Sequence, residues 1–169
     1  MKIDKFLVAV SISIFILAGL WNLTEVLYGK ADTGFDLPGI GVAVFLGWAT
    51  FYAAGAGKGG VIKGIPANMS GIFWGVIIIL IWDNVFGFND FGAFLSVAIG
   101  AGMLCFQAHL KIFAFIPGAF IGTSTFFALG AVVESTTLWP AILGLIIGVL
   151  LGYVSEEFAK LINKKLLKG

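Results

Sequence analysis

The sequence has little charge and no arginine. Only 11% of its 169 residues are charged, and all ten basic residues are lysines. An ordinary soluble domain carries roughly 25% charged residues, so this composition excludes one. The lysines are also scattered, which leaves no basic patch dense enough to bind nucleic acid, and we expect no nucleic-acid partner.

Residues that commonly carry catalysis or bind metal ions are scarce as well. The chain has one histidine, His109, and one cysteine, Cys105. Zinc sites of the HExxH type and a Ser-His-Asp arrangement are therefore poorly supported. Cys105 lies in an apolar stretch and has no partner for an internal disulfide. We expect no enzymatic activity, no cofactor and no metal site.

Apolar residues, by contrast, make up 60% of the chain, and the mean hydropathy is +1.07. A helix needs about 20 apolar residues to cross a bilayer. Glycine-rich and charged segments divide the chain into runs of about that length. We predict an all-α membrane protein with one domain, residues 1–169, and a bundle of six transmembrane helices. The predicted helices are 6–28, 37–57, 66–86, 91–107, 112–133 and 140–167, the last with a cytoplasmic extension.

The lysines indicate how the six helices are oriented. Nine of the ten fall on one side of this arrangement, whereas most acidic residues fall on the other, and Lys30 is the exception. Because lysine in short loops stays in the cytoplasm, both termini are expected there. The lipid bilayer is the first partner, and the bacterial inner membrane is the predicted location.

Prolines and small residues suggest further features. Pro66 and Pro140 suit a first helical turn, and Pro117 falls inside or at the start of the fifth helix. Whether Pro66 and Pro117 mark ordinary helix starts or broken helices stays open at this point. Every predicted helix carries small residues at helical spacing, which allow close packing within the bundle or against a second copy.

A weak internal repeat is also visible. Gly64-Ile65-Pro66 followed by Gly71 resembles Phe115-Ile116-Pro117 followed by Gly122, at a shift of 51 residues. This would relate the second and third helices to the fourth and fifth in the same orientation, and internal duplication is common in transporters.

Polar residues inside membrane helices tend to face the interior of a bundle. Asn68 and Ser70 near the start of the third predicted helix, and Gln107 near the end of the fourth, would form a small polar vestibule if they converge. Trp74 is a candidate for an aromatic constriction beside it, and His109 for a proton-sensitive gate. The candidate pore-lining or substrate-binding residues are Asn22, Asn68, Ser70, Trp74, Gln107, His109 and Thr123.

Several stretches resemble the YcdZ-type family of small bacterial inner-membrane proteins, a domain of unknown function. The most specific is Phe115-Ile116-Pro117-Gly118-Ala119-Phe120-Ile121-Gly122, and Leu138-Trp139-Pro140 and Ser70-Gly71-Ile72-Phe73-Trp74 are similar as well. The resemblance implies a multi-helix inner-membrane protein and no particular substrate. Family members can carry Cys-Pro where this chain has Gly57-Lys58, so no role of that cysteine transfers.

The leading functional hypothesis is a channel or facilitator for a small polar solute, working as a homo-oligomer. It rests on the small-residue helix contacts, the polar groups near helix ends and the lack of an acidic residue at mid-membrane, which a proton-coupled antiporter would normally have. The alternative is a structural or regulatory membrane subunit that binds another membrane protein through its glycine faces.

Overall fold

The computed structural model describes residues 4–30 and 37–166. These residues form α-helices and two short 3₁₀ turns, and no β-strand occurs in the described ranges. The all-α prediction is thus met there. The elements are α1 (Lys5–Lys30), α2 (Ile40–Ala53), α3 (Gly57–Phe86), α4 (Asp90–Phe106), η1 (Gln107–His109), η2 (Lys111–Phe113), α5 (Ile116–Ala128) and α6 (Ser135–Leu166).

Four of the helices, α1, α3, α4 and α6, contain segments long and apolar enough to cross a membrane. The other two are short. At 1.5 Å per residue, the 14 residues of α2 and the 13 of α5 extend about 21 Å and about 20 Å, whereas the bilayer core is about 30 Å thick. The segments predicted as complete spans at 37–57 and 112–133 are therefore shorter helices than expected.

Tight reversals end both short helices. Gly55 and Ala56 follow α2 with φ values of 98° and 57°, and Gly130 and Ala131 follow α5 with 111° and 56°. After α2 the reversal is complete at Gly57, which also has a positive φ of 58°. Residues 58–65, expected to form a loop, are consequently the first turns of α3.

The prolines occupy different positions from those expected. Pro66 and Pro140 lie inside α3 and α6, beyond the first turn, while Pro117 lies in the first turn of α5. An internal proline removes one backbone hydrogen bond and crowds the preceding turn. The helices continue through both sites, so neither Pro66 nor Pro140 marks a helix start.

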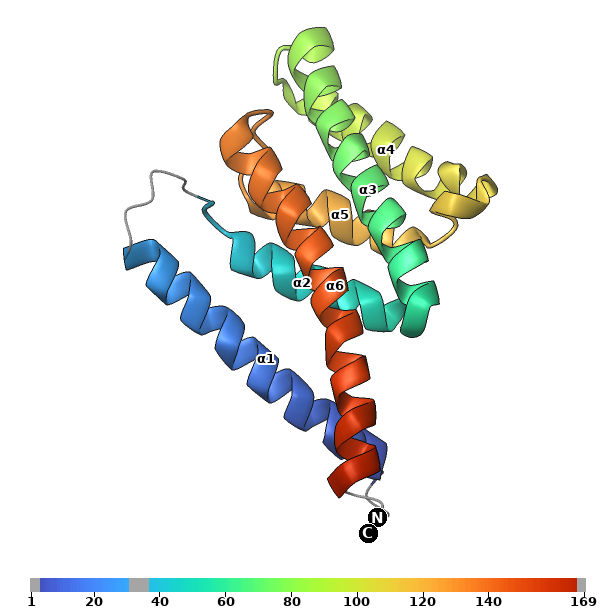
Figure 1. Cartoon of the computed structure of the whole chain (residues 1–169). Helices are drawn as coiled ribbons and strands as arrows, with labels where there is room; N and C mark the ends of the chain where they lie inside the picture. The colour runs from blue at the N-terminus through green and yellow to red at the C-terminus, as the bar shows by residue number, and fades with distance from the viewer. Residues whose placement is uncertain (1–3, 31–36, 167–169) are drawn as a thin grey trace.

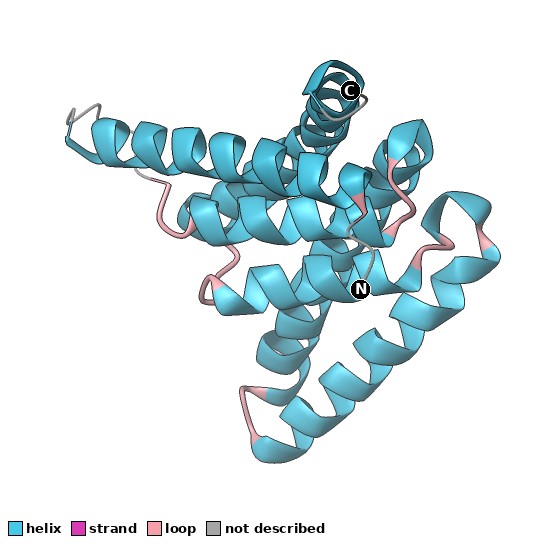
Figure 2. Ribbon diagram, turned by 90° about the horizontal axis from the view of Figure 1, so that it is seen from below, coloured by secondary structure: helices cyan, strands magenta, loops and turns pink. Residues whose placement is uncertain are grey.

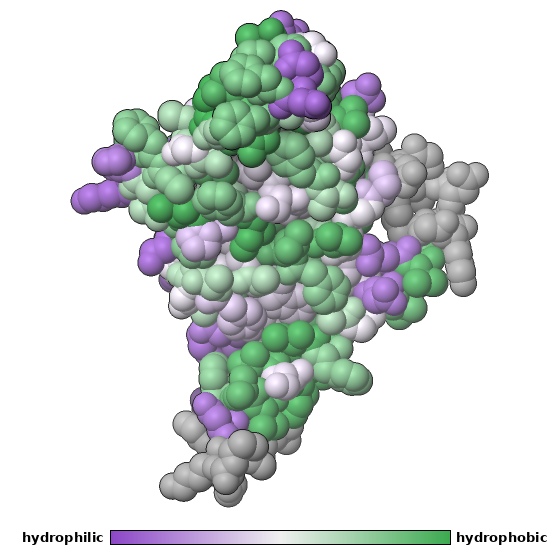
Figure 3. Space-filling view, turned by 180° about the vertical axis from the view of Figure 1, so that it is seen from behind, coloured by the Kyte–Doolittle hydropathy of each residue, from purple (hydrophilic) through white to green (hydrophobic). Residues whose placement is uncertain are grey.

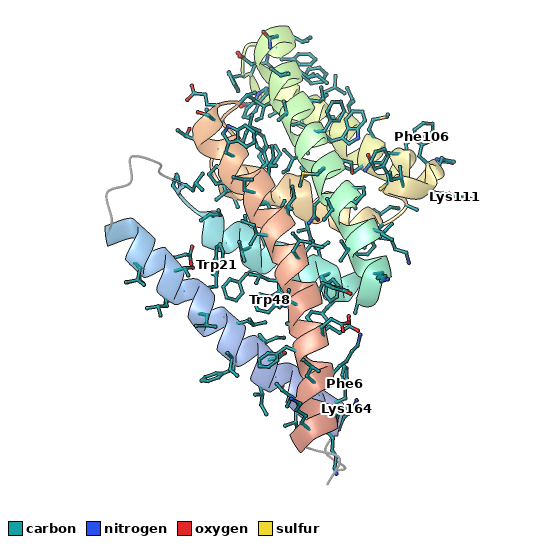
Figure 4. The ribbon with its side chains drawn as sticks, viewed as in Figure 1. Phe6, Trp21, Trp48, Phe106, Lys111 and Lys164 are labelled. Atoms are coloured by element: carbon teal, nitrogen blue, oxygen red, sulfur yellow. The ribbon has the colours of Figure 1, made fainter. Side chains whose placement is uncertain are left out.

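The long helices α3 and α6 are each crossed by a short helix (Figures 1 and 2). α2 packs mainly on α6, and α5 packs mainly on α3, while α1 contacts α6 and α4 contacts α3. The start of α1 and the last turns of α6 lie together, with Phe6 and Lys164 at the same end of the molecule (Figure 4). The predicted repeat of the second and third helices onto the fourth and fifth stays a prediction.

Close approach at the two crossings depends on glycine. A Cβ atom on Gly148 of α6 would meet the backbone of Val44 and Trp48 in α2, and one on Gly71 of α3 would meet the backbone of α5. Much of the face shown in Figure 3 is apolar, and exposed apolar side chains occur along the helices; Phe15 on α1, for example, is 81% exposed. Such a surface suits contact with lipid.

Candidate functional site

A cavity of about 640 Å³ opens between α3, the end of α4 and the two 3₁₀ turns. It lies at the end of α4 that carries Phe106, on the same side as Lys111 (Figure 4). Its walls are mainly apolar and aromatic, as is usual for small-molecule sites. The lining residues are Met69, Ser70, Phe73, Trp74, Met103, Phe106, Gln107, His109, Leu110 and Phe113.

Three of the predicted candidate residues meet in this cavity as a chain of hydrogen bonds. The indole Nε1–H of Trp74 donates to Oε1 of Gln107 at 3.0 Å. The amide Nε2 of Gln107 donates to the Ser70 hydroxyl at 3.1 Å, and Ser70 donates to the carbonyl of Ala67 at 2.7 Å. The chain therefore runs from Trp74 of α3 to Gln107 of η1 and returns to α3 at Ser70.

Local structure explains how Gln107 reaches α3. α4 ends at Phe106, and Gln107 begins the turn η1, where the backbone changes course. The Gln107 side chain is buried. A buried amide costs free energy unless it is hydrogen-bonded, and Trp74 and Ser70 supply those bonds from α3. The expected convergence of Ser70 with Gln107 is present.

His109 lies at the outer edge of the cavity. It is exposed, and its Nδ1 lies 2.7 Å from the carbonyl oxygen of Phe106. Its ring lies against that of Phe106, with 5.0 Å between the centroids. No carboxylate lines this cavity among the residues that the structure describes. A gating role for His109 stays a prediction.

Asn68 and Thr123 lie in the interior, away from the cavity lining. Asn68 is fully buried, and Thr50 of α2 approaches its Oδ1 at 3.2 Å. The Thr123 hydroxyl donates to the carbonyl of Gly71 at 2.7 Å, which joins α5 to α3. The vestibule expected from Asn68, Ser70 and Gln107 thus includes only the last two.

Asn22 does not join the other candidates. It is exposed on α1, and that helix contacts mainly α6. The neighbouring Trp21 lies on the same helix (Figure 4).

A second polar cluster was not predicted. The Ser155 hydroxyl accepts a hydrogen bond from Trp48 Nε1 at 3.0 Å and lies 2.8 Å from the hydroxyl of Tyr52. The Ser13 hydroxyl donates to the backbone carbonyl of Ser155 at 2.8 Å. This Ser155 cluster joins α1, α2 and α6. In the sequence, Ser155 is only a serine at the end of the last apolar run, where a polar residue is expected to mark the end of the membrane segment.

Neither region has the donor set of a metal site. Within residues 4–30 and 37–166, no group of three or more His, Cys, Asp or Glu side chains is arranged to hold a metal ion. The polar side chains in these two regions are the Gln107 amide, serine and tyrosine hydroxyls, tryptophan indoles and, at the cavity edge, the His109 imidazole. Amides, hydroxyls and indoles recognise uncharged hydrogen-bonding groups.

The apolar helices, the lipid-compatible surface and the internal polar clusters define a helical membrane protein. The chain belongs to the family described as "Protein of unknown function (DUF1097)", whose model matches residues 11–160. The predicted resemblance to YcdZ-type inner-membrane proteins is confirmed by the relatives.

Three relatives cover most of the chain. The "Uncharacterized protein YahC" of Escherichia coli (strain K12) is 31% identical over 163 residues, which is 94% of this chain and 96% of the relative. The "Inner membrane protein YcdZ" of the same strain is 27% identical, with 90% of this chain and 85% of the relative covered. Its namesake in Salmonella typhimurium is also 27% identical, with 90% and 87% covered. No solved structure matches the chain.

Proposed function

We propose that the protein is a facilitator for a small solute in the bacterial inner membrane, and that the solute binds in the cavity between α3, α4, η1 and η2. The observation that supports this most strongly is the chain Trp74–Gln107–Ser70 within a largely apolar cavity of about 640 Å³. Sites for small molecules combine apolar walls with a few convergent polar groups in this way.

The lining limits the chemistry of the solute. Gln107 offers a carbonyl acceptor and an amide donor, and Ser70 offers a hydroxyl. No lining residue is acidic, and the cationic Lys111 is not among them. The expected solute is small and uncharged, with polar groups on one side and an apolar remainder against Phe73 and Phe106.

The proposed orientation places both termini in the cytoplasm of a multi-pass protein. The start of α1 and the end of α6 share one end of the molecule (Figure 1), and lysines near that end agree with the positive-inside rule. The cavity then lies toward the cytoplasmic side, because Lys111, which this orientation places in the cytoplasm, lies in the sequence between the lining residues Leu110 and Phe113. No enzymatic activity is part of this proposal.

Solute flux into liposomes tests the proposal. Purified protein in sealed vesicles is mixed with urea, acetamide, glycerol or acetic acid, and swelling is followed by light scattering. The proposal expects faster swelling than in protein-free vesicles for at least one solute, and a loss of that flux in Gln107→Leu. The exposed Asn84→Leu on α3 is the matched control. Equal swelling with and without protein for the whole panel would exclude a facilitator of such solutes.

A structural or regulatory subunit is the second candidate, and the packing of α1 favours it. Only 11% of the most apolar stretch of α1 is buried, against 44% for α3. Such a helix offers a face to a second copy or to another membrane protein. A stable homo-oligomer after gentle detergent extraction supports the facilitator with several subunits, whereas a monomer that copurifies with one defined membrane protein supports the subunit role.

A further inference from the structure

The two glycine crossings are built in the same way. A Cβ on Gly148 would lie 2.8 Å from the backbone N of Trp48, and a Cβ on Gly71 would lie 2.8 Å from the backbone N of Thr123. On the opposite sides of these crossings, a Cβ on Gly47 would lie 2.9 Å from Cα of Leu145, and one on Gly122 would lie 3.0 Å from Cα of Asn68. The α2–α6 crossing therefore corresponds to the α5–α3 crossing, position by position.

The ends of the short helices match equally closely. Gly55 N donates to Tyr52 O at 3.1 Å and Ala56 N to Phe51 O at 3.0 Å. The equivalent bonds after α5, Gly130 N to Phe127 O and Ala131 N to Phe126 O, have the same lengths of 3.1 Å and 3.0 Å. Residues 45–55 and 120–130 are also identical at six of eleven aligned positions. The sequence and the backbone thus agree on this correspondence.

These matches divide the chain into two units, α1–α3 and α4–α6. The helix partners follow the same division, because α1 packs on α6 as α4 packs on α3. α1 begins at the end of the molecule where α6 finishes, whereas α4 begins at the opposite end (Figure 1). The units are therefore inverted relative to each other, an arrangement found in transporters that bind solute where the repeats meet. This division differs from the parallel repeat predicted from Pro66 and Pro117.

Comparing equivalent residues of the two units identifies a buried polar side chain that is present in only one of them. Asn68 corresponds to Leu145, and both are fully buried at their crossings. Thr50 corresponds to Thr125, and each hydroxyl donates to the carbonyl four residues earlier, on Leu46 and Ile121. At the α2–α6 crossing the apolar side chain of Leu145 fills the equivalent position, so close packing of such a crossing does not require an amide there.

The Asn68 amide is also incompletely paired. Thr50 approaches one end of it at 3.2 Å, while Nδ2 at the other end has no hydrogen-bond partner among the described residues. Exchanging the oxygen and nitrogen of the amide would leave the oxygen unpaired instead. An unpaired buried polar group is costly, so packing alone does not account for an amide at this position.

We propose that the Asn68 amide is the recognition group of a second, occluded solute site at the crossing of α3 with α5. The ligand class is a small uncharged molecule whose hydrogen-bond donor and acceptor are adjacent, such as a primary amide or urea, because the side chain itself offers that pair. This proposal rests on the proposed function, since the Asn68 site would bind the same solute once it has left the cavity. In the structure the crossing is closed around it.

The test compares the protein with Asn68→Leu, which copies the apolar residue of the equivalent crossing. Urea and acetamide flux into liposomes should fall about tenfold, the effect of losing one hydrogen bond to a solute in a buried site. The unfolding midpoint without solute should not fall. Acetamide at high concentration should raise the unfolding midpoint of the original protein and leave that of the variant unchanged. Asn84→Leu, exposed on the same helix, should behave as the original protein in every assay.

The outcomes separate the two proposals. Equal flux in the original protein and Asn68→Leu would overturn the Asn68 site and leave the facilitator intact. No flux in either, with acetamide stabilising only the original protein, would reject transport and retain the site. If Asn68→Leu does not fold, Asn68→Ala takes its place; loss of the folded state in both would make Asn68 a structural residue and overturn the proposal.

Discussion

The indole nitrogen of Trp48 donates a hydrogen bond to the hydroxyl of Ser155 at 3.0 Å, across 107 positions of sequence. This bond joins the short helix α2 to the long helix α6, close to the site where Ser13 of α1 reaches the Ser155 carbonyl. The same hydroxyl donates to the carbonyl of Gly152 at 2.7 Å. Three helices therefore meet at one residue, and Ser13, Trp48 and Ser155 are all buried.

Replacing Ser155 with alanine should destabilise the protein by about 1–3 kcal/mol, because the buried Trp48 indole then loses its acceptor. The free energy of unfolding in mixed micelles, followed by tryptophan fluorescence, measures the change. Ser124→Ala is the matched control, since Ser124 is exposed on α5. Equal losses in the two variants would show that the Ser155 cluster contributes nothing specific.

Adding a methyl group at Gly148 should be more damaging. The new Cβ would overlap the α2 backbone, and neither helix can yield without separating the pair. Gly148→Ala should lower the free energy of unfolding by about 1–3 kcal/mol or more, as overpacking typically does. Gly19→Ala on α1, where a Cβ meets nothing within 4 Å, should be neutral or slightly stabilising. The same unfolding assay applies, and an undisturbed Gly148→Ala would contradict the close helix crossing.

A carboxylate of α6 caps the start of α3. Oε2 of Glu156 accepts a hydrogen bond from Gly57 N at 2.6 Å, and Oε1 lies 2.9 Å from Lys160. A negative charge at a helix N-terminus stabilises it, so Glu156→Gln should cost about 1 kcal/mol of stability. Glu157→Gln, whose side chain is 49% exposed, should cost much less. Indistinguishable unfolding curves for the two variants would show that Glu156 does not stabilise the start of α3.

Some helices could be predicted from the sequence because they have a distinct hydropathy pattern, and others could not. Long apolar runs predicted α1, α3, α4 and α6. The shortness of α2 and α5 was not predictable from hydropathy, because apolar residues also fill the tight reversals at Ala56 and Ala131. Pro66 resembles a helix start in the sequence, but α3 begins nine residues earlier, at Gly57, directly after the reversal at Gly55 and Ala56.

The candidate site was predictable only in part. Ser70, Trp74 and Gln107 were selected as polar or aromatic residues near helix ends, and they meet in the structure. Asn68 lies only two residues from Ser70, but that spacing turns it to another face of the helix. Ser155 was missed because its partners come from two distant helices, and such pairing leaves no local pattern.

Cysteine labelling tests the orientation. In a Cys105→Ser background, Glu134→Cys should react from the periplasmic side with a reagent that does not cross the membrane, and Lys111→Cys should react only after the membrane is opened. The reason is the distribution of lysines, which favours a cytoplasmic position for Lys111. Mass spectrometry of the labelled protein measures the result. The reverse labelling pattern would show that the molecule has the opposite orientation, with the cavity on the periplasmic side.

Chemical modification of the cavity wall tests whether the solute passes through the cavity. Met103 lines the cavity, and Cys105 is the free exposed cysteine of the same helix. Met103→Cys in a Cys105→Ser background is placed in liposomes and modified with a methanethiosulfonate, and solute flux is measured before and after. A facilitator that uses this cavity should lose about tenfold in flux on modification, while the Cys105→Ser parent keeps its flux. Complete modification at position 103, verified by mass spectrometry, with unchanged flux would contradict a solute path through the cavity.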